Sequence, residues 1–207
     1  MLDSILQRVT KLSQVAVWLG GALLIFAALM TTVDVVLRKV LNWSFGGADE
    51  IAGYMFAIST AFAMSYALLQ RSHVRIDALY TVLPPRVRTV LDVLAFLMLA
   101  SFLVLITERA FAVWWGSYES SSVSITPLVT PLALPQGFWF AGFVFVMFVI
   151  ALMTMRIAVA VFQRDWVRIA ELVGARGLDE EVEEERAAAL AKLEDAKALL
   201  ARRNKEA

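Results

Sequence analysis

Side chains that could do chemistry are few in this chain of 207 residues, and three of them alternate in one polar stretch. His73, Arg75 and Asp77 are of the types that metal sites and acid–base catalysis use. His73 is the only histidine and cysteine is absent, which excludes a multi-histidine zinc site, a haem held by two histidines and disulfides within this chain. The sequence has no glycine-rich phosphate loop and no nucleophile–base pair at a recognisable spacing. We therefore expect no enzyme, no metal site and no cofactor.

Two explanations of this polar stretch stay open. Arginines flank it on both sides, and basic residues beside membrane spans set the orientation of a chain and contact lipid headgroups. That explanation requires neither the imidazole nor the carboxylate. The second hypothesis is that His73, Arg75 and Asp77 shape the turn into the next helix, because a carboxylate two residues from an arginine can fix that side chain or accept a bond from a backbone amide.

Further charged residues lie near the first predicted loop. Asp34 interrupts an apolar run and lies four residues before Arg38, so the two can pair on one face of a helix. An ion or proton site at Asp34 is the alternative, since charges inside spans are functional candidates by default. After the turn signal Gly46–Gly47, Asp49 and Glu50 open the second helix, where acids favour the positive end of the helix dipole. These two acids could do only that or could also contact a partner subunit.

The elements that must hold these residues are long apolar segments. A transmembrane helix needs about 20 mostly apolar residues, and four stretches qualify, at about 15–37, 51–69, 90–107 and 137–155. The composition agrees, since 60% of the residues are hydrophobic and 18% are charged, against about 45–50% and 25% in soluble domains. The sequence therefore predicts an all-α membrane protein with four transmembrane helices.

Basic and aromatic residues predict how these helices are oriented. Nine Lys and Arg flank the spans on the side of the N-terminus, and three flank them on the other side. Because cytoplasmic loops carry the excess of positive charge, both the N- and C-termini should be cytoplasmic. The tryptophans fit belts at the two membrane surfaces, four near the outer ends of spans and two near the inner ends: Trp43, Trp114, Trp115, Trp139, and Trp18, Trp166.

The distribution of charge divides the chain in two. Residues 162–207 hold 20 of the 38 charged side chains. We expect a four-helix membrane domain over residues 1–168 and a charged cytoplasmic tail over residues 169–207. Acidic residues are concentrated at the start of the segment from Asp179, and basic residues at its end. This distribution suits the dipole of a C-terminal cytoplasmic helix from about residue 179. The net charge of zero gives no electrostatic basis for binding nucleic acid.

The outer loop over residues 116–136 differs from an ordinary polar connection. Glu119 is its only charge, and prolines at positions 127, 131 and 135 block a regular helix there. An uncharged apolar loop outside the membrane should lie in the interface or pack on protein. We expect it to pack on another subunit or on an external partner.

Polar residues inside the four spans are sparse. A chain that carried a solute alone would need a polar path or broken helices at mid-membrane. Since neither is visible, the sequence favours an accessory membrane subunit. The alternatives are a small autonomous four-helix carrier or channel, and a membrane anchor subunit without a transport role.

Four short motifs occur in a recognisable order. The first span ends in Arg38-Lys-Val-Leu-Asn42, and Asp49-Glu50 begins the second helix. Ser72-His-Val-Arg-Ile-Asp77 follows, and Pro135-Gln-Gly137-Phe closes the proline-rich loop. Over about residues 10–165 this order resembles the small membrane subunit of tripartite ATP-independent periplasmic (TRAP) transporters, of the dicarboxylate-permease small-subunit type. Gly53 departs from the family pattern, in which an arginine is common.

The resemblance implies partners and a location. Such a subunit sits in the lipid bilayer of the bacterial inner membrane with a large multi-span permease subunit, to which a periplasmic solute-binding protein delivers an organic anion, often a carboxylate. A sodium gradient drives uptake, the large subunit holds the transport sites, and the small subunit braces it. The structural or subunit-interface candidates are then Asp34, Arg38, Asn42, Asp49, Glu50, His73, Arg75, Asp77, Pro135 and Gly137.

Overall fold

The computed structural model describes residues 2–44, 46–71 and 83–174, and beyond these only positions 186–187, 189–190, 193 and 197. The chain forms two compact units, Met1–Gly174 and Ala175–Ala207. The polar stretch with His73, Arg75 and Asp77 lies outside the described residues. So does nearly all of the helix expected from about residue 179.

The first unit consists of helices, in agreement with the predicted class. Four of them are long and apolar enough to cross a membrane: α1 (Leu2–Leu41), α2 (Ala48–Leu69), α4 (Pro85–Glu119) and α5 (Ala133–Phe162). A short helix, α6 (Trp166–Val173), follows them. The 40 residues of α1 span about 60 Å at 1.5 Å per residue, twice the thickness of a hydrocarbon core. The polar first turns of α1 therefore extend beyond the apolar segment.

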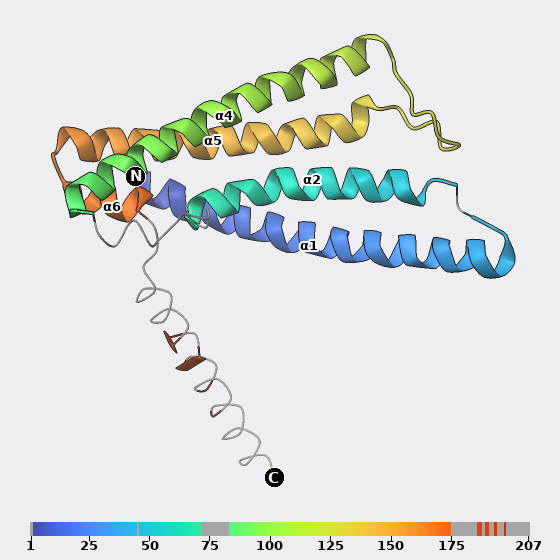
Figure 1. Ribbon diagram of the computed structural model, residues 1–207, viewed down its shortest axis with the longest axis horizontal. Helices are drawn as coiled ribbons and strands as arrows, with labels where there is room; N and C mark the ends of the chain where they lie inside the picture. Colours follow the sequence, from blue (N-terminus) through green and yellow to red (C-terminus); the bar gives the residue numbers. More distant parts are fainter. Residues whose placement is uncertain are drawn as a thin grey trace. The chain divides into compact units, whose positions relative to one another are not determined.

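The long helices run up and down and pack as an open row (Figure 1). Helix α1 packs on α2, α2 on α5, and α5 on α4, so α1 and α4 are the outer members. We call the end where α1 turns into α2 and α4 into α5 the hairpin end, and the other end, where α6 lies, the α6 end (Figure 1). The row order leaves much of α1 and α4 without a neighbour from this unit.

The α1–α2 contact depends on small residues at heptad spacing. Ser13, Gly20, Ala27 and Asp34 recur every seven residues along α1, and all four are buried. A Cβ on Gly20 would lie 3.2 Å from the Cβ of Ser59 on α2. Small residues at this spacing let two helix backbones approach closely, which is a common way for helices to associate in membranes.

The α2–α5 contact is closer still. A Cβ on Gly142 of α5 would lie only 2.7 Å from the Cβ of Ala61 on α2. Both residues are buried. No side chain larger than hydrogen fits at position 142 without moving the helices apart, so this glycine sets the distance at the centre of the row.

Helix α6 packs against α4 and α5 at the α6 end of the row. Asp165 caps it by accepting a hydrogen bond from the backbone N–H of Arg168 at 3.0 Å. Ile169 and Val173 then face inward and join the apolar core formed with α4 and α5. The predicted division of the chain at residue 168 thus falls inside a helix that packs with the first unit. Sequence reasoning did not anticipate α6.

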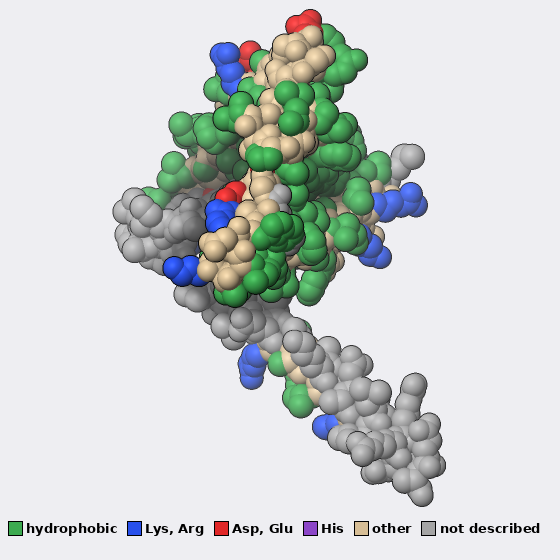
Figure 2. Space-filling view, turned by 90° about the vertical axis from the view of Figure 1, so that its right-hand side faces the viewer, with side chains coloured by type: hydrophobic (Ala, Val, Ile, Leu, Met, Phe, Trp, Pro, Cys, Tyr) green, Lys and Arg blue, Asp and Glu red, His purple; other side chains and the backbone are tan. Residues whose placement is uncertain are grey.

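Hydrophobic side chains dominate the surface of this unit. Figure 2, which views the hairpin end, shows them over most of the visible helical surface, with few charged groups among them. In the most apolar window of α1 only 11% of the residues are buried, and in that of α5 33% are. A surface of this kind is stable against lipid or against the helices of another protein, and not against water.

Candidate functional site at the hairpin end

Asp34 anchors the turn between α1 and α2. Its side chain is 1% exposed, and its carboxylate forms an ion pair with the guanidinium of Arg38 one helical turn later. The second carboxylate oxygen accepts a hydrogen bond from the hydroxyl of Ser44 at 2.9 Å. The same hydroxyl oxygen accepts from the backbone N–H of Gly46 at 3.1 Å. The predicted local pair therefore exists, and it also holds the turn.

The backbone of this turn needs residues that tolerate the left-handed region. Asn42 follows the last residue of α1 with a φ of 52°, and Gly46 has a φ of 72°. Asparagine and glycine adopt this conformation more easily than other residues. Asn42, singled out by the family resemblance, thus ends α1 through its backbone.

The 120–132 loop folds back over this turn. A Cβ on Gly47 would lie 2.1 Å from the Cδ1 of Leu128, so the loop covers the first turn of α2 at close range. Within the loop, the Ser124 N–H donates to the Thr130 carbonyl at 2.9 Å, and the Leu132 N–H donates to the Ser122 carbonyl at 3.0 Å. The loop is therefore a short hairpin that packs on its own chain.

Glu50 joins this loop to α2. One carboxylate oxygen accepts hydrogen bonds from the hydroxyls of Thr126 and Ser124, and the other accepts from the phenol of Tyr54. Asp49, its neighbour, is exposed. The sequence predicts the same role for both acids, but their contacts differ, because Glu50 faces the loop and Asp49 faces outward.

Part of the loop still points away from the unit. Ile125 is fully exposed, and Val123 and Val129 are about half exposed. Leu128, by contrast, has its Cδ atoms against Gly47. The loop thus buries some of its apolar surface within the chain. Its tip stays exposed and can contact lipid headgroups or another protein.

Pro135 and Gly137 start α5. The helix begins at Ala133, four residues before the predicted start of the span. Pro135 fits its first turn because the N–H groups there have no helical partner. A Cβ on Gly137 would lie 3.0 Å from the indole Nε1 of Trp114, which stacks on Phe140 at 5.5 Å between ring centroids. Gly137 thus leaves room for this aromatic contact between α4 and α5.

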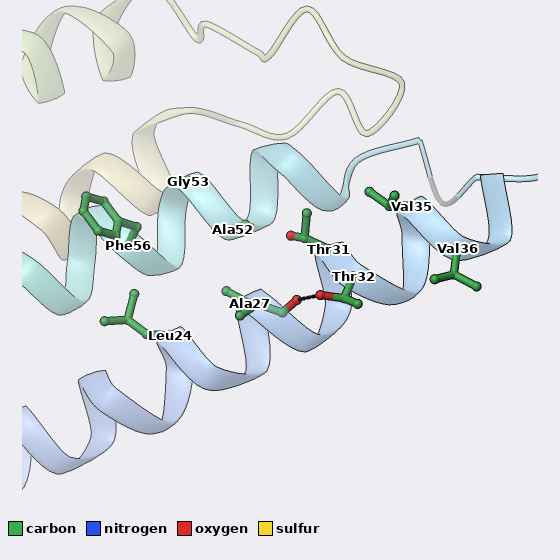
Figure 3. Close-up of a pocket in the computed structure, with 10 residues that line it drawn as sticks. Leu24, Ala27, Thr31, Thr32, Val35, Val36, Ala52, Gly53 and Phe56 are labelled. Carbon is green, nitrogen blue, oxygen red and sulfur yellow. Dashed lines mark hydrogen bonds between the residues drawn. The ribbon is translucent and has the colours of Figure 1, made fainter. Parts of the chain in front are cut away.

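A groove of about 640 Å³ lies between α1 and α2, next to the turn that joins them and on its side toward the α6 end (Figure 3). Its wall is almost entirely apolar, with Ala27, Ala52 and Gly53 among the lining residues. The Thr32 hydroxyl donates to the Ala28 carbonyl of its own helix at 2.7 Å (Figure 3). A Cβ on Gly53 would meet no atom within 4 Å. Position 53 therefore borders an open groove in this chain.

The described residues contain no group of three or more His, Asp or Glu that could hold a metal ion. His73, Arg75 and Asp77 are outside this set, so the hypothesis that they shape a turn stays a prediction. What the structure does bring together is Asp34 with Arg38 and Ser44, and Glu50 with the 120–132 loop. The first group holds the α1–α2 turn on α1 and the second holds the 120–132 loop on α2, so both carboxylates have the character of structural links.

The fold is that of a multi-pass membrane protein. The contacts of Asp34 and Glu50 hold the loops at its hairpin end against the helices. Among known protein families, residues 27–165 match the tripartite ATP-independent periplasmic transporters, DctQ component. The match covers well over half of the chain, which therefore belongs to this family. No curated protein and no solved structure matches the chain.

Family membership confirms the resemblance and the predicted location. The chain is the small component of a TRAP transporter, a multi-pass protein of the inner membrane. The family is one of transporter components and not of enzymes. The orientation of the two termini stays a prediction.

Proposed function

We propose that this chain is the accessory, bracing subunit of a sodium-driven transporter that imports an organic anion, most simply a carboxylate. Its partners are a large multi-span permease subunit, which holds the solute and sodium sites, and a periplasmic solute-binding protein, which delivers the solute. The membership in a family of tripartite, ATP-independent transporter components supports this assignment.

The observation that carries the proposal is the absence of charged side chains from the middle of the four described spans. No Asp, Glu, Lys or Arg occurs between Lys11 and Asp34 in α1, after Glu50 in α2, or before Arg156 in α5. In α4 none occurs between Asp92 and Glu108. A subunit that carried an anion and its counter-ion through these helices would need such groups at mid-membrane.

The packing of the unit also supports a bracing role. An open row of helices with apolar outer faces offers a long surface for a second membrane protein. The links at Asp34 and Glu50 stabilise the hairpin end, because the first ties the α1–α2 turn to α1 and the second ties the 120–132 loop to α2. We extend the same role to His73, Arg75 and Asp77, which would shape the connection at the opposite membrane surface.

The test of the proposal is reconstitution with a large permease subunit of the same transporter family. The tagged full chain should co-purify with that permease in detergent, and liposomes that hold the chain alone should show no sodium-dependent uptake of dicarboxylates or monocarboxylates. Solute uptake by the chain alone would favour an autonomous carrier, and failure to bind the permease would favour an anchor role. Asp77→Asn should lower the yield of the complex and leave the apparent solute affinity unchanged, since the loop is not expected to touch solute.

A further inference from the structure

A pocket of about 200 Å³ lies at the α6 end, between the first turns of α4, the end of α5 and α6. Its lining is mostly apolar, with one hydroxyl and one guanidinium: Val90, Val93, Val161, Trp166, Thr89 and Arg164. It belongs wholly to the first unit and is separate from the hairpin end. Nothing in the proposed bracing role uses it.

Arg164 provides the charge of this pocket. It has a φ of 54° in the tight connection between α5 and α6. The neighbouring acid, Asp165, caps α6 by accepting the Arg168 N–H at 3.0 Å, and it forms no ion pair with Arg164. Asp92, on the neighbouring α4, is 3% exposed and has its own interaction within the protein. In the described part of the chain Arg164 forms no ion pair.

The start of α4 adds positive potential. Thr89 of the pocket lies in the second turn of that helix, whose first turn holds no acid and whose N-cap, Pro84, makes no side-chain hydrogen bond. The first turn of α4 also carries Arg86 and Arg88. Pro84 and Pro85 have no backbone N–H, and the N–H groups of Val87 and Arg88 donate to the Pro84 carbonyl at 3.0 and 3.1 Å, so the positive charge at this helix start comes mainly from Arg86 and Arg88. The mouth of the pocket is thus electropositive and its interior is apolar.

The surroundings of the pocket are those of a membrane surface. Phe162 is 90% exposed, and Val167 and Trp166 are also exposed, while Ile169 and Val173 on the other face of α6 are buried. A short helix with an apolar inner face and exposed aromatic and basic residues is typical of the headgroup region of a bilayer. The pocket therefore opens where phospholipid headgroups meet acyl chains.

We propose that this pocket binds one acidic phospholipid of the membrane. Arg164 would bind the phosphate, and Val90, Val93 and Val161 would contact the first segment of an acyl chain. An acidic headgroup fits better than a zwitterionic one, because the cationic group of the latter would lie beside Arg164 and the positive end of α4. A soluble anion fits less well, since it leaves the valines without an apolar partner.

Native mass spectrometry of the full chain in detergent tests this proposal. Dioleoyl phosphatidylglycerol should bind at least about fivefold tighter than dioleoyl phosphatidylcholine, the effect expected for one arginine near a charged headgroup. Glycerol 3-phosphate should not compete with the lipid. Equal affinity for the two lipids, or competition by glycerol 3-phosphate at similar concentration, would overturn the proposal.

Two variants and one matched control locate the site. Arg164→Gln should weaken phosphatidylglycerol binding on the order of fivefold and remove the preference over phosphatidylcholine. Val161→Phe should weaken both lipids, because it fills the pocket from a position that is 51% exposed and tolerates a larger side chain. Arg109→Gln removes an exposed arginine farther along α4 and should change neither affinity. Unchanged lipid binding in Arg164→Gln and Val161→Phe, or an equal loss in Arg109→Gln, would show that the lipid binds elsewhere.

Discussion

Replacement of Gly142 tests the packing at the centre of the helix row. A Cβ at this position would lie 2.7 Å from the Cβ of Ala61 and 3.2 Å from both the Ala61 carbonyl carbon and a ring carbon of Phe62. Carbon atoms in contact prefer about 3.5–4.0 Å. Gly142→Ala therefore forces α2 and α5 apart by roughly 1 Å, and Gly142→Val forces a larger separation.

The expected magnitude follows from two opposing effects. Overpacking of a well-packed site costs about 1–3 kcal/mol, whereas alanine is favoured over glycine inside a helix by about 1 kcal/mol. Gly53→Ala is the matched control, because its Cβ meets no atom within 4 Å and gains only the helix preference. Gly142→Ala should then be about 1–3 kcal/mol less stable than Gly53→Ala, and Gly142→Val less stable still.

Thermal unfolding of the full-length variants in one detergent measures this difference. For a chain of this length, 1 kcal/mol shifts Tm by about 2–4 °C, so Gly142→Ala should melt several degrees below Gly53→Ala. Equal melting temperatures for the two alanine variants would refute the close approach of α2 and α5. A Gly142→Val variant as stable as the wild type would refute it as well.

Three further predictions concern the hairpin end and the topology. Glu50→Gln should raise hydrogen exchange of the 120–132 loop, because the neutral amide accepts weaker hydrogen bonds from Thr126 and Ser124 than the carboxylate does. Asp49→Asn should leave the exchange unchanged, and equal effects of the two variants would contradict the assignment. Asp34→Asn removes the charge that pairs with Arg38, whose side chain is 55% exposed, and should destabilise the protein by about 1–3 kcal/mol, seen as a lower Tm; an unchanged Tm would show that the pair is dispensable. Reporter fusions near residue 80 and near residue 125 should report cytoplasm and periplasm respectively; the reverse pattern would overturn the predicted orientation.

The four spans could be predicted because a long apolar run has few alternatives, but their ends could not. Helix α5 begins at Ala133 although Pro135 lies ahead of the apolar run. A proline in the first turn loses no helical hydrogen bond, so it marks the start of the helix and not a loop. Helix α6 was missed because eight residues give a weak pattern, although a cap at Asp165 followed by Trp166, Ile169 and Val173 is the signal that could have found it.

In the candidate site, contacts between residues close in sequence could be predicted, and contacts between distant residues could not. Asp34 and Arg38 are four residues apart, so helical spacing alone predicts their pairing. Glu50 and Thr126 are 76 residues apart, and their contact exists only because the 120–132 loop folds back on α2. The sequence holds a hint of it, since a loop with many hydroxyls and almost no charge needs an acceptor nearby.

Sodium-driven uptake into proteoliposomes tests the central claim most directly. The large permease, the loaded solute-binding protein and this chain are reconstituted together, and each preparation is repeated without one component. Uptake is expected only when all three are present, and none with this chain alone, because its described spans hold no Asp, Glu, Lys or Arg at mid-membrane. Full uptake by the permease and binding protein without this chain, or uptake by this chain without the permease, would contradict a bracing subunit.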